Sequence, residues 1–424
     1  MEPVSPVDRI KSIDIVRGVA LLGILLMNVV SFSLPDPAYW DPSGHGGDTG
    51  WSLRVYFFNN LMVNGSMRAI FSMLFGAGMI LFTDSKERTG FPADAAGAWY
   101  RRTIWLIVFG ILHAYLLLFP GEILFYYGIA GLFLYPARKA SPSRLLLFSL
   151  FLVMVLTTIR ISDYRVTRQL YEEASTAEKT LEMSRAITPD QQVAIEKWTY
   201  KYNTYKPDSL AREQVIRTMQ GGYRSAMASI APYTRYMQTE YLYRYGFLDA
   251  LSMMLLGMAL IRWRVLQGQR SVRFYLGMAL VGYGIGIPVN WLETTTYMKS
   301  GFDLVTYFRI SQSYDLGRIF TAMGHLGVIL ICTKRCGVKI IETAFGAVGR
   351  MALTNYVMQT VLGTIIFIGF KQFGQWERYQ LYYLVGAIWV FQLITSTIWL
   401  RYHRFGPLEW VWRRLTYGRW FFVK

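Results

Sequence analysis

Long apolar runs recur along this chain and constrain its fold more than any other feature. An α-helix rises 1.5 Å per residue, so roughly twenty apolar residues cross the ~30 Å hydrocarbon core of a bilayer. Charged residues make up 17% of the chain, whereas soluble domains carry about 25%. The sequence therefore predicts an all-α polytopic membrane protein. We expect about ten transmembrane helices, near residues 14–34, 60–83, 102–119, 122–136, 143–160, 246–262, 272–292, 315–333, 351–370 and 380–401.

The basic residues are distributed unevenly between the loops. The net charge is +17, which in a soluble protein would suggest a nucleic-acid partner. If the N-terminus is cytoplasmic, the loops on that side hold 22 Lys and Arg, while the short loops on the other side hold 5. The positive-inside rule expects this asymmetry and places both termini in the cytoplasm. The excess charge is therefore topological, and the expected partner is a lipid bilayer with no role for nucleic acid.

One long polar stretch divides the predicted spans into two halves. Residues 1–160 form a first half of five helices and residues 244–402 a second half of five. The stretch 161–243 has apolar residues at helical spacing, so we expect an extracytoplasmic helical region that either caps a site or only connects the halves. Residues 403–424 mix Trp, Tyr and Arg, which is typical of an interfacial tail.

Polar side chains form a stripe on the first predicted helix, in "RIKSIDIVRGVALLGILLMN". Arg17 and Asn28 are eleven residues apart and fall within about 20° of one face, and Asp14 lies about 60° away. Asn28 is roughly 21 Å from Asp14 along the axis. The stripe fits a substrate path. Alternatively, Arg17 reaches the inner headgroups and Asn28 bridges two helices.

The third span repeats this pattern, because Arg102 and His113 are also eleven residues apart and share a face. The following "FPGEILFYYG" predicts a tight outer turn that places Glu122 at the head of the next helix. A carboxylate near an imidazole orients it and raises its basicity, as a general base requires. His113 and Glu122 are therefore candidate catalytic residues, although a histidine in a helix also serves as a structural hydrogen-bond donor.

Other ionisable groups lie in the spans, where they are costly and usually face the bundle interior. In "SYDLGRIFTAMGHLG", Asp315, Arg318 and His325 fit a proton path, an anion clamp or a buried ion pair. Arginines around a bundle can also pair bidentately with phosphate or carboxylate. The candidate substrate- and donor-binding set is Asp14, Arg17, Asn28, Arg68, Arg102, Asp315, Arg318, His325, Arg350 and Asn355. Cys332 and Cys336 are the only cysteines, and no metal site is expected.

Six stretches resemble the YeiB-type family of bacterial inner-membrane proteins. They are "RIKSIDIVRGVALLGILLMN", "PAYWDP", "RAIFSMLFGAGMILF", "RRTIWLIVFGILHAYLLLFPGEILFYYGIAGLFL", "GRMALTNYVMQ" and "GPLEWVWRRLTYG", in the same order over nearly the whole chain. His113 belongs to the G-x-x-H-A pattern of that family, while Gly121, Glu122, Ile123 and Leu124 replace its usual Gly-Asp-Ile-Leu. The resemblance implies a multi-pass protein of the bacterial cytoplasmic (inner) membrane.

That family is grouped distantly with transmembrane acyltransferases of the heparan glucosaminide N-acetyltransferase type, which this chain resembles in its first helix. Asp14, Arg17, Gly18 and Asn28 match an Asp-x-x-Arg-Gly helix that is followed by an Asn and an outer loop. His45, in "DPSGHGGDTGW", falls where those enzymes carry a luminal histidine. The resemblance implies transfer of an acyl group from acyl-CoA, such as acetyl-CoA, to an acceptor across the membrane, with His45 as a further candidate base.

Two functions from different classes fit the residues and the resemblance. The first is a membrane acyltransferase that moves an acyl group from a CoA thioester to an envelope glycan or small-molecule acceptor. The second is a transporter of a small anion or lipid-like compound, with Asp315, Arg318 and His325 as the coupling path. A third alternative is a structural or sensory protein whose 161–243 region binds a partner. A homodimer is compatible with the sequence, which leaves the oligomeric state open.

Overall fold

The computed structural model describes residues 10–88, 92–335 and 337–417, and every regular element in these ranges is a helix. The α-helices are α1 (Lys11–Ser33), α2 (Gly50–Met62), α3 (Ser66–Arg88), α4 (Pro92–Leu116), α5 (Leu124–Leu132), α6 (Pro142–Glu182), α7 (Pro189–Tyr205), α8 (Ser209–Gln220), α9 (Tyr223–Tyr236), α10 (Phe247–Arg262), α11 (Val272–Lys299), α12 (Leu304–Ile310), α13 (Tyr314–Arg335), α14 (Lys339–Arg350), α15 (Ala352–Gly363), α16 (Leu381–Tyr402) and α17 (Pro407–Tyr417). The 3₁₀ helices are η2 (Asp36–Tyr39), η3 (Pro42–His45) and η4 (Tyr135–Lys139), and the π-helices are η5 (Met237–Gly246) and η6 (Thr364–Gly369).

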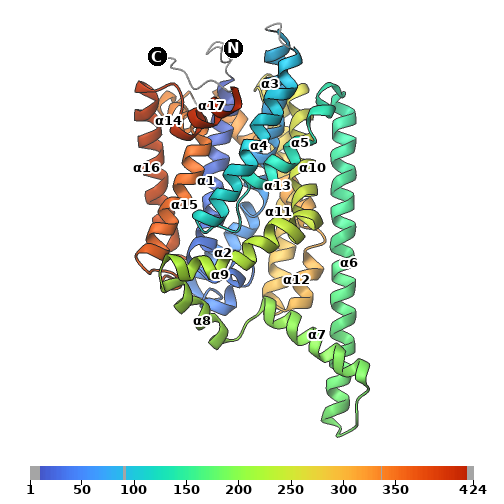
Figure 1. Ribbon diagram of the computed structural model, residues 1–424. Coiled ribbons are helices and arrows are strands. Elements are labelled where there is room, and N and C mark those ends of the chain that lie inside the picture. Colours follow the sequence, from blue (N-terminus) through green and yellow to red (C-terminus); the bar gives the residue numbers. More distant parts are fainter. Residues whose placement is uncertain (1–9, 89–91, 336, 418–424) are drawn as a thin grey trace.

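Eight described helical segments are long and apolar enough to cross a membrane, by length and composition. They are Lys11–Ser33, Gly50–Ser85, Pro142–Glu182, Tyr223–Arg262, Val272–Lys299, Tyr314–Arg335, Ala352–Gly369 and Leu381–Tyr402. The predicted all-α polytopic class is therefore confirmed. Figure 1 shows the start of α1 and the helix α17 at the same end of the bundle, which we call the inner end. The opposite end, which carries α8 and α12, is the outer end.

The remaining two predicted spans, 102–119 and 122–136, form a hairpin of α4 and α5. The helix α5 has nine residues and is about 14 Å long, short of the ~30 Å hydrocarbon core. The tip of the hairpin is fastened inside the molecule, because Thr364 Oγ1 on η6 donates to the carbonyl of Leu117 at 2.7 Å. The hydroxyl of Tyr223 on α9 donates to the carbonyl of Leu116 at 2.8 Å. The hairpin therefore enters from the inner end and returns to it.

The helix α6 continues without a break through the boundary predicted at residue 160. Its 41 residues extend about 62 Å, so it projects past the outer end of the bundle in Figure 1. The helix α7 packs back on it through Tyr171 and Trp198, whose ring centroids lie 5.0 Å apart. The region 161–243 is helical, as expected, and its last helices lead back to the hairpin tip.

Glycines allow the helix backbones to approach closely at a few positions, as is common in lipid. A Cβ on Gly76 of α3 would lie 1.9 Å from the carbonyl oxygen of Met254 on α10, and one on Gly257 of α10 would lie 1.8 Å from that of Met73 on α3. The helices α11 and α13 meet in the same way at Gly282. These contacts set the register at which the polar side chains of neighbouring helices meet.

Replacing Gly76 with alanine should lower the stability of the fold, because the added methyl group overlaps a backbone atom of α10. We expect a loss of about 1–3 kcal/mol in the free energy of unfolding. Gly78, on the same helix, is the matched control, because a Cβ at that position would meet nothing within 4 Å. Thermal unfolding in detergent, followed by tryptophan fluorescence, should show a lower midpoint than wild type for Gly76→Ala and a wild-type midpoint for Gly78→Ala. Equal midpoints would contradict the close α3–α10 contact.

Candidate active site

His113, on α4, and Glu122, in the turn before α5, meet at the tip of the hairpin. The Nδ1 atom of His113 lies 3.6 Å from Oε1 of Glu122, just beyond hydrogen-bonding distance. Their side chains are 2% and 1% exposed. The structure thus brings together the two residues that the turn sequence suggested, although they are nine positions apart in the chain.

The start of α5 holds Glu122 in place. Its carboxylate accepts a hydrogen bond from the amide of Phe125 at 2.9 Å and another from the amide of Leu124. These contacts cap the helix and place a negative charge at its N-terminus, where the helix dipole favours it. Gly110 lets α4 approach the cap, because a Cβ there would lie 2.4 Å from the amide nitrogen of Phe125.

The imidazole of His113 is buried without a hydrogen bond. Neither ring nitrogen has a hydrogen-bond partner among the residues that the structure describes. The ring of Tyr356, on α15, stands edge-on at 5.1 Å, and its hydroxyl accepts from the amide of Ile123 at 3.2 Å. Because buried polar groups in proteins are nearly always hydrogen-bonded, the exception at His113 points to a group that a bound molecule would supply.

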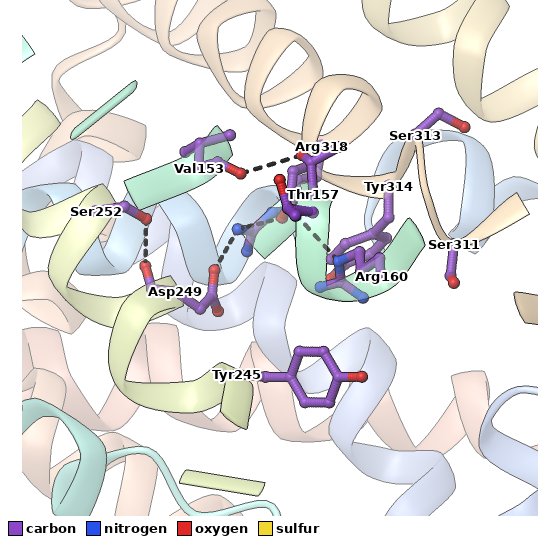
Figure 2. Close-up of polar contacts among 12 residues, drawn as sticks. Val153, Thr157, Arg160, Tyr245, Asp249, Ser252, Ser311, Ser313, Tyr314 and Arg318 are labelled. Carbon is purple, nitrogen blue, oxygen red and sulfur yellow. Dashed lines mark hydrogen bonds and ion pairs between the residues drawn. The ribbon is translucent and has the colours of Figure 1, made fainter. Parts of the chain in front are cut away.

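A second cluster is an alternating chain of five charged side chains from four helices. Asp249 on α10 pairs with Arg68 on α3, Oδ2 to Nη2 at 3.0 Å, and with Arg318 on α13. Asp315 on α13 lies 2.7 Å from Nη2 of Arg318 and accepts from Nε of Arg160 on α6 at 3.1 Å. Figure 2 shows Asp249 beside the Arg318 guanidinium, with Arg160 on its far side. We call these five residues the arginine–aspartate chain.

The arginine–aspartate chain lies deep in the bundle. Arg160 is about 27 Å from the start of α6, and Asp249 about 20 Å from the end of α10. The ring of Tyr314 lies 4.9 Å from the guanidinium of Arg160 and 5.1 Å from that of Arg318, within range of a cation–π contact. The cluster therefore stands in the outer half of the membrane-crossing region.

The sequence patterns singled out Arg68, Asp315 and Arg318 but not their partners Asp249 and Arg160. Asp249 is the one acidic residue in the apolar α10, and an acid in such a helix is itself a sign of an internal site. Arg160 stands at the predicted outer edge of the fifth span, where an arginine only marks a boundary. The continuation of α6 beyond that point places it inside the cluster.

His325 does not join Asp315 and Arg318, so the predicted ladder divides. Its Nδ1 shares a hydrogen bond with the hydroxyl of Tyr283 on α11 at 2.8 Å, and its Nε2 bonds to the carbonyl of Met62 on α2 at 2.7 Å. Both nitrogens of this ring are therefore used to join three helices, in contrast to those of His113.

A pocket of about 370 Å³ opens at the inner end between α1, α14 and α16. Its charged lining residues are Lys11, Asp14, Glu342, Arg350 and Arg401. Lys11 pairs with Glu342 at 2.5 Å, and Arg350 donates to the carbonyl of Arg404 at 3.3 Å. Three basic groups against two acids leave the lining with a positive surplus, which suits an anionic ligand.

Two other predicted donor-binding arginines, Arg17 and Arg102, lie at different places at the inner end. Arg17 lies 3.3 Å from Asp14 and 3.5 Å from the carbonyl of Gly349. Arg102 stacks on the ring of Trp412 of α17 at 3.5 Å, and Trp412 Nε1 donates to the Arg102 carbonyl at 2.9 Å. Arg17 therefore borders the pocket, whereas Arg102 fastens α17 to α4.

The outer end carries a pocket of about 360 Å³ between the η2–η3 loop and the connection of α7 to α8. His45 lines it together with Arg212 and Lys206, and Lys206 lies 3.2 Å from Asp41. Burial lowers the pKa of His45; a hydrogen bond to the Gly374 backbone opposes this effect, and Arg212 reinforces it. The His45 imidazole is therefore neutral at pH 7.

The two predicted asparagines lie apart from each other. Asn355 is fully buried, and its amide donates to the carbonyl of Val348 at 3.2 Å and to the Ser396 hydroxyl at 2.9 Å, so it joins α15 to α16. Asn28 is half-buried on α1. Cys332 lies in the last turn of α13, whereas Cys336 lies outside the described residues.

Comparison with known proteins finds relatives that match over nearly their whole length. A family model described as "Protein of unknown function (DUF418)" matches residues 260–419. The chain is 30% identical over 417 residues to the protein YeiB of Escherichia coli (strain K12), covering 96% of each chain. It is 27% identical to YxaH of Bacillus subtilis (strain 168), over 99% of this chain and 97% of that one. No solved structure matches it. The chain belongs to the YeiB-like family of multi-pass membrane proteins.

Proposed function

We propose that this protein is an integral-membrane acyltransferase of the bacterial inner membrane that uses His113 as its general base. The observation that carries the proposal is the buried, unpaired imidazole of His113 beside the anchored carboxylate of Glu122. A base needs a nitrogen free to take a proton and a neighbour that stabilises the resulting cation. Glu122 supplies that neighbour, and the amides of Leu124 and Phe125 hold its carboxylate in place.

The chemistry is transfer of an acyl group from a thioester to a hydroxyl or amine. With Nδ1 of His113 facing Glu122, Nε2 takes the proton of the acceptor as the acceptor oxygen or nitrogen bonds to the thioester carbonyl carbon. The carbon–sulfur bond then breaks, and the imidazolium gives its proton to the leaving thiolate. The donor leaves as a free thiol, and His113 is again neutral.

The inner pocket is the proposed entry for an acyl-CoA donor. Arg350, Arg401 and Lys11 place three basic groups around it, which suits the phosphates of CoA. Lys11 begins α1 and Arg401 lies in the last turn of α16, both at the inner end, and Arg350 ends α14 at the same pocket. His113 lies deeper, at the tip of the hairpin. An extended pantetheine arm directed along α1 would bring the thioester toward the hairpin.

We assign the base to His113 rather than His45. The His45 imidazole lies in the outer pocket, where the cations Arg212 and Arg378 help to lower its pKa. The acids Asp41 and Asp208 also line this pocket, but neither forms an ion pair with His45 in the described structure. Neighbouring cations oppose the charge that a base must acquire. His45 and its pocket are instead the proposed outer approach for a glycan or small-molecule acceptor.

Transport of a small anion is the second candidate function. The arginine–aspartate chain favours it, because charged groups inside a membrane often line an ion path. The predicted coupling ladder, however, lacks its histidine, since both nitrogens of His325 are engaged elsewhere. The transferase proposal is therefore preferred.

An assay with the purified protein distinguishes the two functions. Proteoliposomes are incubated with acetyl-CoA labelled in the acetyl group and with an extract of bacterial envelope lipids and glycans. The proposal predicts free-thiol release that depends on the extract, with label in one of its components. Flux of an anion with no thiol release would favour transport and overturn the transferase proposal.

A further inference from the structure

We infer that the arginine–aspartate chain is an oxyanion-binding site, open toward the outer end, that receives the phosphate or carboxylate of a molecule distinct from the acyl donor. Its role as the binding site for the acyl acceptor rests on the proposed function. Anion binding by these residues does not depend on that proposal.

The charge balance of the chain is the first argument. Within the described residues, Arg68, Arg160 and Arg318 form ion pairs with Asp249 and Asp315, so these five side chains carry one positive charge in excess. Glu293 of α11 is within electrostatic range of Arg160 but forms no ion pair with it there. The Nε and Nη1 atoms of Arg318, whose side chain is 1% exposed, have no hydrogen-bond partner among the described residues. A buried guanidinium with unused donors is costly unless a further acceptor completes its hydrogen bonds.

Access is the second argument. Arg68 exposes 34% of its side chain although it projects from α3 into the interior, toward Asp249 of α10. Its Nη2 also lies 3.4 Å from the hydroxyl of Tyr314. Burial raises the pKa of Tyr39, in the outer turn η2; Tyr314 adds to the rise and Arg68 opposes it. Arg68 is therefore within electrostatic range of an outer loop, the side from which we expect an anion to approach.

The position of Tyr127 relates this site to the candidate base. Its hydroxyl lies 2.7 Å from the Ser72 hydroxyl and donates to the carbonyl of Arg68 at 3.5 Å. Tyr127 belongs to α5, the helix that Glu122 caps. Tyr127 therefore links α3, which carries Arg68, to α5, which Glu122 caps. An acceptor bound by its anionic group at Arg68 would present its nucleophile toward the hairpin.

The oxyanion has two sources that share this chemistry, a free anion and a lipid headgroup phosphate. In the first arm, protein in phosphatidylcholine nanodiscs is titrated calorimetrically with inorganic phosphate and with acetate. In the second, the protein is reconstituted with phosphatidylglycerol, and lipid retained after purification is counted by native mass spectrometry. Each arm compares wild type with Arg68→Gln, Arg68→Lys and Arg168→Gln. Arg168 is the control because its ion pair with Glu172 is more than half exposed on α6.

We expect binding in one of the two arms. Arg68→Gln should weaken it about tenfold, while Arg68→Lys and Arg168→Gln stay within about threefold of wild type. Arg68→Gln should fold, since Asp249 keeps its ion pair with Arg318, and an unchanged thermal midpoint verifies this. Absence of binding in both arms, or equal binding by wild type and folded Arg68→Gln, overturns the inference. The binding arms contain no acyl donor and are independent of the acetyl-CoA assay. Anion binding together with no transfer in that assay overturns the proposed function alone, and transfer together with no anion binding overturns this inference alone.

Discussion

Replacing His113 with alanine should lower the rate of acyl transfer by about 10²- to 10⁴-fold, the usual contribution of a general base. The reason is that no other described side chain at the hairpin tip offers an unpaired imidazole nitrogen next to a carboxylate. The variant should bind the acyl donor as wild type does, because the inner pocket contains no part of the hairpin tip. The measurement is kcat from thiol release, together with a donor titration by calorimetry.

The matched control for this experiment is His403→Ala. His403 is an exposed histidine that stacks on Trp399 at 4.1 Å in the turn before α17, far along the chain from the hairpin. The His403→Ala variant should retain the wild-type kcat. Glu122→Gln should lower kcat less than His113→Ala does, since it removes only the charge that stabilises the imidazolium. Full activity in folded His113→Ala would refute the assignment of the base.

Replacing Asp249 with alanine should destabilise the fold far more than removal of an exposed acid does. The side chain separates Arg68 from Arg318, and its loss leaves two guanidinium groups without their shared anion inside the bundle. Removing one partner of a buried pair costs about 3–5 kcal/mol. This corresponds to a fall in the thermal midpoint on the order of 10 °C.

Asp84→Ala is the control for the Asp249 variant. Asp84 lies 3.5 Å from Arg262 at the inner end, and the two side chains are 37% and 33% exposed. Exposed pairs contribute about 0–1 kcal/mol, so this variant should unfold close to the wild-type temperature. The midpoints come from tryptophan fluorescence during heating in the same detergent. If Asp249→Ala unfolds no earlier than Asp84→Ala, the arginine–aspartate chain does not hold the helices together.

The parts of this structure that could be predicted from the sequence depend on local chemistry. The length of each apolar run identifies the membrane spans, because backbone polar groups inside a bilayer must be hydrogen-bonded and a helix satisfies them within one segment. The meeting of His113 and Glu122 follows from a short turn between them. The short α5 was not foreseen, since hydropathy counts apolar residues and does not register that the helix ends at Leu132, before the turn η4 around Pro136.

The partners of the buried arginines depend on packing between distant segments. Asp249 faces Arg68 because Gly76 and Gly257 bring α3 and α10 into contact at one register, and nothing in either helix sequence alone specifies that register. His325 is the opposite case, in which the sequence predicted partners that packing did not provide. Its spacing from Arg318 placed it on a shared helix face, but Tyr283 and Met62 from other helices take up its ring nitrogens.

The most direct test of the account is acyl transfer with donor and acceptor on opposite sides of a membrane. Sealed proteoliposomes are loaded with acetyl-labelled acetyl-CoA, and the acceptor fraction is added outside. We expect label on the external acceptor while the released CoA stays in the lumen, and loss of both signals in His113→Ala. Label on the acceptor only when donor and acceptor share one compartment would contradict a site that joins an inner donor pocket to an outer acceptor.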